Sequence, residues 1–131
     1  TLKAIAQKSI KEVTYHKRWS SEWVIRLGDG TDESKEKIQR AIEDVWMYTG
    51  ELFMSQPADA DLIAAGVIPD VTGLKAAWDE AVKAVISEAT LTLPEDEFMQ
   101  DGGRTGFHTE HLGYILAEMQ FLPRAYPDAT W

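Results

Sequence analysis

The amino-acid sequence predicts an all-α fold, an antiparallel helix bundle. Apolar residues recur three and four positions apart along four long segments, which is the spacing of helices with one buried face. No segment shows the strict alternation of apolar and polar residues that marks a strand. The chain has 131 residues, so we expect residues 1–131 to form a single helical domain.

The first helix is expected over residues 2–27. Glycines at positions 28 and 30 predict its end, because glycine accepts the left-handed conformation that closes many helices. A linker this short predicts an antiparallel hairpin with the next helix. The stripe of the first helix mixes apolar and polar residues: Leu2, Ile5, Ala6, Ser9, Glu12, Val13, His16, Trp19, Trp23, Val24, Arg26 and Leu27.

Three further helices are expected over residues 32–54, 70–90 and 109–122. Thr31 or Asp32 offers the N-cap of the second helix, and Pro123 lies at or just past the end of the fourth. Residues 57–66 predict a connector with about two helical turns that Gly66 closes. The polar, glycine-rich residues 92–106 predict a loop.

The charge of the chain excludes some classes of partner. The 22 acidic and 13 basic residues give a net charge of -9, which would repel a nucleic acid or an anionic membrane. No run of about 18 apolar residues could span a membrane. The absence of cysteine excludes disulfides and thiolate metal sites and favours the cytoplasm, where we expect the protein to be found.

Glu12 and His16 lie one turn apart inside the stripe of the first helix. A buried carboxylate is unfavourable without a partner, and a metal is one explanation, because di-iron bundle proteins project Glu-x-x-His pairs inward. Here Tyr15 follows Glu12 at the third position, and the histidine comes one residue late, about 100° further around the helix. The other explanation is an ion pair of Glu12 with His16 or with a neighbouring cation.

The other helices do not complete a di-iron site. Thr49 occupies the centre of the second apolar face, with Asp44 and Glu51 only at its edges. Glu88 comes near the end of the third helix, and the fourth has no central carboxylate. The number of available ligands therefore favours the structural explanation of Glu12 and His16.

A second candidate is the HTEH segment, which places His108 and His111 three positions apart, with Glu118 two turns beyond. The HExxH spacing of zinc proteases is absent, so a structural role such as a capping bond from His108 is favoured. The nearby GGRTG segment lacks the GK[ST] ending of a phosphate loop and predicts a flexible turn.

The tryptophans suggest both core and contact surfaces. Trp19, Trp23, Trp46 and Trp78 are spaced as core residues, with anchoring of a partner helix as the alternative. Trp131 is the last residue, and we expect it to dock into a groove.

Several stretches together resemble a known family. They are YHKRWSSEWVIRLGDGTDES, VWMYTGELF, LKAAWDEAV, SEATLTLPED and GGRTGFHTEHLGYILAEMQFLPRAYPDATW. They are similar to the PaaC subunits of bacterial phenylacetyl-CoA epoxidase complexes, over essentially the whole chain. The resemblance covers about the C-terminal half of that family's length, and the chain starts as if within a helix. An incomplete ferritin-like bundle without its N-terminal helices is therefore expected.

The resemblance also implies a function. In that complex a related subunit carries the di-iron centre and binds the CoA thioester, while PaaC is its structural partner. The assembly uses oxygen and reducing equivalents from NADPH, delivered by a separate reductase, to epoxidise the aromatic ring of phenylacetyl-CoA. Glu12 would match the glutamate of the second Glu-x-x-His motif, with Tyr15 in the place of its histidine. Glu12, Tyr15 and His16 would then mark a vestigial site, with no catalytic residue and no cofactor in this chain.

The sequence therefore predicts a non-catalytic structural subunit that scaffolds a di-iron catalytic subunit in aerobic phenylacetate degradation. By itself it would not be an enzyme. Its apolar helix faces are expected to bury against that subunit or to drive self-association. A different class remains open, namely a small metal-binding ferritin-like oxidase that uses Glu12, His16 and Glu88 across a homo-oligomer.

Overall fold

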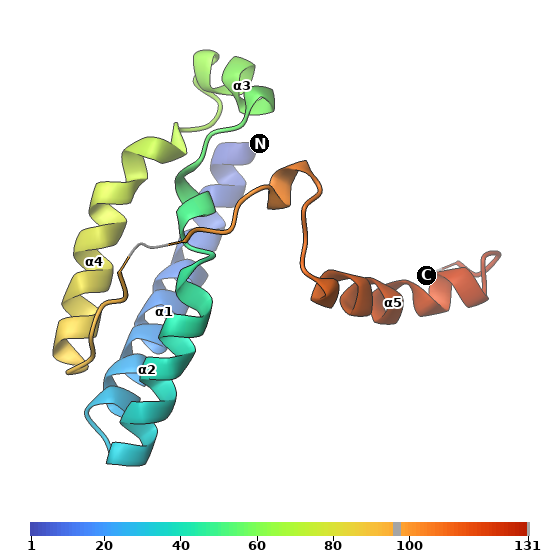
Figure 1. The fold of residues 1–131 in the computed structure, drawn as a ribbon. Helices are drawn as coiled ribbons and strands as arrows, with labels where there is room; N and C mark the ends of the chain where they lie inside the picture. Colours follow the sequence, from blue (N-terminus) through green and yellow to red (C-terminus); the bar gives the residue numbers. More distant parts are fainter. Residues whose placement is uncertain (96–97, 131) are drawn as a thin grey trace.

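The computed structural model describes residues 1–95 and 98–130, which form helices and turns without a strand, so the predicted all-α class is confirmed. The helices are α1 (Leu2–Gly28), α2 (Asp32–Trp46), α3 (Ala60–Ala64), α4 (Lys75–Glu88) and α5 (Glu110–Ala125). Short 3₁₀ turns lie at Gly50–Phe53, Pro57–Asp59, Val71–Leu74 and Gly103–Thr105. Helices α1, α2 and α4 lie side by side and alternate in direction, as an antiparallel bundle requires, whereas α5 projects crosswise away from them (Figure 1).

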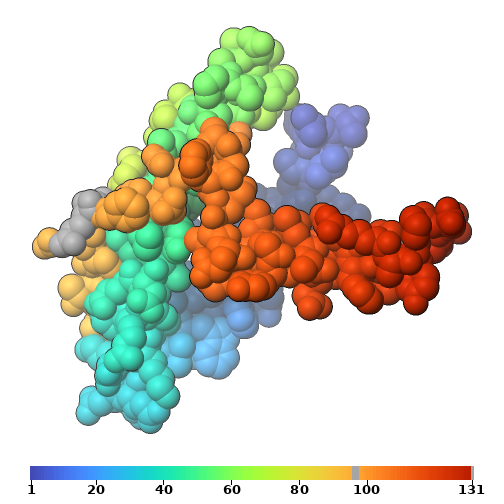
Figure 2. Space-filling view, turned by 45° about the vertical axis from the view of Figure 1, so that its right-hand side comes forward, coloured from blue at the N-terminus to red at the C-terminus, as the bar shows by residue number. Residues whose placement is uncertain are grey.

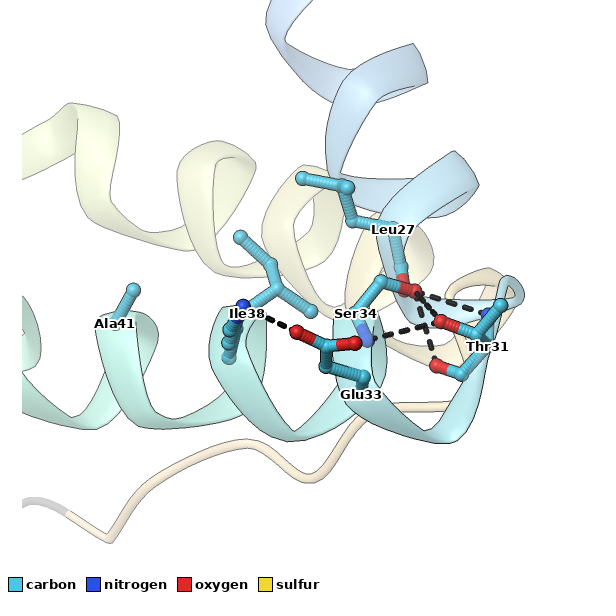
Figure 3. Close-up of a pocket in the computed structure, with 7 residues that line it drawn as sticks. Leu27, Thr31, Glu33, Ser34, Ile38 and Ala41 are labelled. Atoms are coloured by element: carbon cyan, nitrogen blue, oxygen red, sulfur yellow. Dashed lines mark hydrogen bonds and ion pairs between the residues drawn. The ribbon is translucent and has the colours of Figure 1, made fainter.

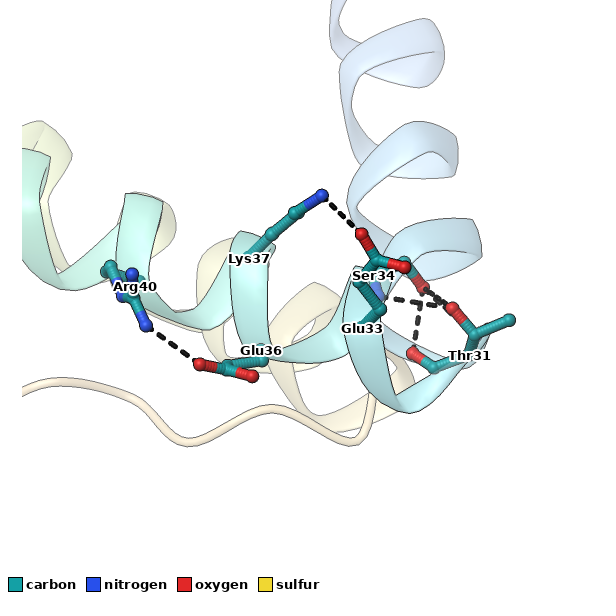
Figure 4. A network of polar contacts seen from close by, with 6 residues as sticks. All are labelled: Thr31, Glu33, Ser34, Glu36, Lys37 and Arg40. Carbon is teal, nitrogen blue, oxygen red and sulfur yellow. Dashed lines mark hydrogen bonds and ion pairs between the residues drawn. The ribbon is translucent and has the colours of Figure 1, made fainter.

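The corner between α1 and α2 is fixed by a capping box, which confirms Thr31 as the N-cap. The Ser34 N–H donates to the Thr31 hydroxyl at 3.2 Å, and the Thr31 N–H donates to the Ser34 hydroxyl at 3.0 Å. The Ser34 hydroxyl also donates to the Leu27 carbonyl at 2.8 Å and so ties α2 to the last turn of α1. Along the exposed side of α2 the ion pairs Glu33–Lys37 and Glu36–Arg40 add a few tenths of a kcal/mol each (Figure 4).

The predicted left-handed glycine at the end of α1 is wrong. The C-cap residue is Asp29, with φ −93°, and Gly28 is still helical. A Cβ on Gly28 would lie 2.9 Å from the Cβ of Ala89, at the end of α4. Gly28 is therefore required by the close approach of α1 and α4, and this approach is the most buried place in the described residues: Gly28, Ile86 and Ala89.

The second helix is shorter than the predicted residues 32–54, because α2 ends at Trp46. In a continuing helix the Met47 carbonyl would accept the N–H of residue 51, but it accepts the Gln100 N–H at 2.8 Å. The Thr49 hydroxyl donates to the Trp46 carbonyl at 2.8 Å, which competes with helix continuation. Contact with the distant segment 98–100 thus ends the helix.

The third predicted helix also begins late, at Lys75. The Asp70 carboxylate accepts the Thr72 N–H at 3.0 Å and starts a 3₁₀ turn in place of the first helical turn. At the other end α4 stops at Glu88, and Thr90 takes a left-handed φ of 57°. The connector prediction is confirmed, since helical turns span Pro57–Ala64 and Gly66 closes them at φ 66°.

The fourth predicted helix continues past Pro123 to Ala125. Proline lacks the N–H that would bond one turn back, but the Tyr126 N–H reaches the Leu122 carbonyl at 2.9 Å and extends the helix. Helix α5 is exposed along its length apart from the half-buried Leu112 and Gln120.

The core between α2 and α4 is aromatic. The rings of Trp46 and Trp78 lie 5.8 Å apart, and the Phe53 ring lies 5.3 Å from Trp78. All three side chains are half-buried. The core prediction is wrong for Trp19 and Trp23, which are exposed on α1, and Trp131 lies outside the described residues.

Candidate functional site

Glu12, Tyr15 and His16 are all exposed on the N-terminal half of α1, so the predicted burial of Glu12 and His16 is wrong for this chain. Helices α2 and α4 have 15 and 14 residues, whereas α1 has 27, so they cover only part of it. Shielding along α1 begins at Ser21. The stripe that the sequence shows is present, but nothing in the described chain lies over its first half.

The donor set around Glu12 does not fit a di-iron centre within one copy of the chain. Glu88 adjoins Ala89, which contacts Gly28, and His16 lies twelve residues before Gly28, a rise of about 18 Å along α1. Tyr15, at the place of the expected histidine, has the Arg18 guanidinium 5.6 Å from its ring centre. Among the described residues no three His, Cys, Asp or Glu side chains converge as ligands.

An aromatic strip runs along one side of α1 through the segment where the metal motif was sought. It consists of Tyr15, Arg18, Trp19, Trp23 and Arg26. The Trp19 and Trp23 rings meet edge to face at 6.3 Å and remain 54% and 44% exposed. Arg26 lies 5.6 Å from the Trp23 ring centre. Glu22 lies 3.9 Å from Arg18 and 4.0 Å from Arg26, which holds the two arginines along the strip.

The GGRTG segment is a defined turn. Gly102 and Gly106 have φ 86° and 103°, conformations that favour glycine. Between them Arg104 donates two hydrogen bonds of 2.8 Å to the Asp59 carboxylate. The Arg104 N–H donates to Glu51 at 3.2 Å. Sequence reasoning missed this contact, since only the single arginine in a glycine-rich loop hinted at it.

The HTEH segment lines a cleft of about 310 Å³ between the turn Gly50–Phe53 and the start of α5. His108 and His111 share it with Tyr48, Glu51 and Gln100. The N-cap of α5 is Thr109, not His108. The two histidines therefore border one cleft, where the His111 ring lies 6.4 Å from the Tyr114 ring.

A second hollow, of about 400 Å³, lies at the corner of α1 and α2 (Figure 3). Its floor is formed by Leu27, Ile38 and Ala41, and the Glu33–Lys37 pair borders it. An apolar floor with a charged rim suits an apolar side chain of a protein partner better than a polar small molecule.

The accessible surface of the chain is far larger than a compact monomer of its mass would have. A monomer of 14.7 kDa has an expected surface of about 6,900 Å². This chain exposes 10639 Å², an excess of about 3,700 Å². Much of it lies on α1 and on α5, which stands clear of the bundle in Figure 2. None of the described helices is both long and apolar enough to cross a membrane.

Comparison with known proteins places the chain. The profile of the family described as "Phenylacetic acid catabolic protein" (PaaA_PaaC) matches residues 1–131. The chain belongs to this family. Within the PaaA_PaaC family, the PaaC subunit of 1,2-phenylacetyl-CoA epoxidase from Escherichia coli (strain K12) is 48% identical over 130 residues. The match covers 99% of this chain and 52% of the relative, so the chain spans about half the length of that relative.

Membership of the PaaA_PaaC family confirms the resemblance that the sequence motifs indicate. The described helices agree with the helical bundle expected for that family. In this PaaA_PaaC chain, the features that stand ready for contact are the aromatic strip, the corner hollow and α5, all on the outside of the bundle.

Proposed function

We propose that this chain is a non-catalytic structural subunit of a phenylacetyl-CoA epoxidase, which scaffolds the di-iron catalytic subunit in aerobic phenylacetate degradation. The observation that carries the proposal is the 48% identity with the PaaC subunit of the E. coli epoxidase across 99% of the chain. The chain would hold no cofactor, and the iron and the CoA thioester would belong to the partner.

The chemistry of α1 supports a scaffolding role. A di-iron centre needs several carboxylates and histidines pointing to one place, and Tyr15 stands where a histidine ligand would be needed. Glu12 and His16 face solvent, where they cannot enclose metal ions away from water. Redox chemistry on phenylacetyl-CoA, with oxygen and NADPH-derived electrons, would therefore take place in the partner subunit.

The exposed surface supplies what a scaffold needs. The excess area of about 3,700 Å² exceeds the roughly 1,000–2,500 Å² that each partner buries in an obligate complex. The aromatic strip is the best anchor for the catalytic subunit, because tryptophan, tyrosine and arginine dominate binding energy at interfaces. Its rings are held by each other and by arginine, so little side-chain freedom is lost on binding.

Co-purification with the di-iron subunit tests this function. The wild-type chain should co-purify, and the double variant Trp19→Ala/Trp23→Ala should bind at least about tenfold more weakly, since each such anchor contributes about 1–2 kcal/mol or more. Leu62→Ala, an exposed apolar position on α3, is the matched control and should bind as the wild type does. Both positions on α1 are exposed, so circular dichroism should show unchanged helicity. Failure of the wild-type chain to bind would overturn the proposal.

A further inference from the structure

Helix α5 is an apolar helix without a seat in its own chain. Its exposed side chains include Tyr114, Ile115, Met119, Phe121 and Leu122, and Met119 is 71% exposed. The turn that precedes α5 is anchored by Arg104 to Asp59, and α5 leaves this turn away from α1, α2 and α4 (Figure 1). Apolar helices of this length are marginal in water unless one face is covered.

The N-terminal half of α1, residues 2–18, is a second helix segment without cover. Each of these residues is exposed, including Leu2, Ile5 and Val13 on one stripe. Seventeen residues of helix rise about 25 Å, and the 16 residues of α5 rise about 24 Å. The two uncovered surfaces therefore match in length.

The two segments also carry opposite charge. Residues 1–18 hold five basic side chains and one acidic side chain, although the whole chain has a net charge of -9. The acidic residue is Glu12, and the basic ones are Lys3, Lys8, Lys11, Lys17 and Arg18. Residues 107–130 hold three acidic side chains, Glu110, Glu118 and Asp128, and one basic side chain, Arg124. Contact between the two would offset the repulsion between two acidic copies.

We propose that two copies of this chain associate reciprocally, with α5 of each copy lying along residues 2–18 of α1 in the other. Each copy then both gives a helix and receives one, so the assembly closes with twofold symmetry. The excess surface of about 3,700 Å² per copy is ample for the contact, because a stable interface buries about 800 Å² or more on each partner. The contact lies outside Trp19 and Trp23, so it does not depend on the function proposed above.

The first test is the mass of the purified 131-residue chain by light scattering and sedimentation between 1 and 100 µM, on the order of the concentrations at which marginal dimers separate. The wild-type chain should be a dimer at the upper end. Met119→Asp on α5 and Val13→Asp on α1 should each shift it to the monomer, because each buries a charge in both contacts. Val67→Asp, at an exposed apolar position of the connector, should leave the dimer unchanged.

Mixing separates a specific exchange from unspecific stickiness. A mixture of the Met119→Asp and Val13→Asp chains keeps one intact pair, α5 of the second against α1 of the first. It should form heterodimers more strongly than either variant forms homodimers. Lys17→Glu should weaken the dimer more than Lys83→Glu, although both change the net charge equally.

Three results would overturn the proposal. They are a wild-type monomer at 100 µM or about that concentration, a dimer that survives both charged substitutions, and a mixture no more dimeric than its components. If Met119→Asp abolishes binding of the di-iron subunit and the wild-type chain alone is a monomer, then α5 docks on that subunit instead. Loss of binding by Trp19→Ala/Trp23→Ala, with the dimer intact, would concern only the proposed function.

Discussion

Arg104 and Asp59, 45 positions apart in the chain, face each other across two parallel hydrogen bonds of 2.8 Å. The Asp59 side chain is only 15% exposed, and it also accepts the Gln56 N–H at 3.1 Å. A planar guanidinium on a carboxylate fixes both position and orientation. This pair joins the turn before α5 to the connector after α2, and it sets the direction in which α5 leaves the bundle.

Arg104→Lys should loosen this turn. Lysine keeps the charge but cannot make the two parallel hydrogen bonds, so residues 100–110 should exchange amide hydrogens faster and be cut sooner by trypsin-like proteases. Arg124→Lys, near the end of α5, is the matched control and should leave the turn unchanged. Equal exchange in Arg104→Lys and the wild type would show that the pair does not hold the turn.

The two ordered carboxylates predict acid sensitivity. Hydrogen bonds from Arg104 hold the pKa of Asp59 below its usual value of 3.8, and the Thr72 N–H does the same for the pKa of Asp70. A pKa that is lower in the folded state means stability that is present above pH 3.8 and lost as the pH falls through the folded pKa. Urea unfolding at successive pH values should show this loss.

Asp59→Asn and Asp70→Asn provide the check on that pH dependence. Each should be less stable than the wild type at pH 7 and should lose less of its remaining stability on acidification below about pH 4. Glu110→Gln, at an exposed position at the start of α5, should follow the wild-type curve. Parallel acid curves for all four proteins would contradict the assignment.

Gly28→Ala should destabilise the bundle. The added Cβ would meet the backbone and the Cβ of Ala89, which cannot move without shifting α4. We expect a net loss of about 1–2 kcal/mol, since overpacking costs about 1–3 kcal/mol and alanine recovers up to about 1 kcal/mol of helix propensity. Gly113→Ala in α5 meets open space and should be neutral or stabilising. Urea unfolding measures both, and equal stability of the two variants would contradict the close approach.

Thr31→Ala should cost about 1 kcal/mol, because it removes the side chain that caps α2. Thr14→Ala is the matched control. Its hydroxyl bonds the Ile10 carbonyl at 2.7 Å within an exposed helix, where alanine is the better helix former. Thermal unfolding should therefore rank Thr14→Ala at or above the wild type and Thr31→Ala below it.

The sequence predicted the elements that depend on local signals. The α1–α2 hairpin and the cap at Thr31 follow from short-range spacing and capping chemistry, and the structure has both. It mispredicted features set by distant contacts. Gln100 takes the Met47 carbonyl and ends α2, and Ala89 requires a glycine at position 28, but neither partner is near in sequence.

The candidate site was predictable in identity and not in surroundings. Periodicity placed Glu12 and His16 on the stripe of α1, but whether a stripe is covered depends on other helices, and α2 and α4 end short of it. Trp19 and Trp23 show the same effect, since a tryptophan spaced for a core and one spaced for a partner look alike in sequence. The Arg104–Asp59 pair left almost no local signal.

The iron content of the purified complex with the di-iron subunit, with and without Glu12→Ala in this chain, tests the scaffolding role most directly. The account predicts that Glu12→Ala chains bind the partner as the wild type does and that iron per complex is unchanged. It also predicts no stoichiometric iron in this chain alone after anaerobic loading. Iron bound to this chain and lost on Glu12→Ala would contradict the account and favour the metal-binding oxidase.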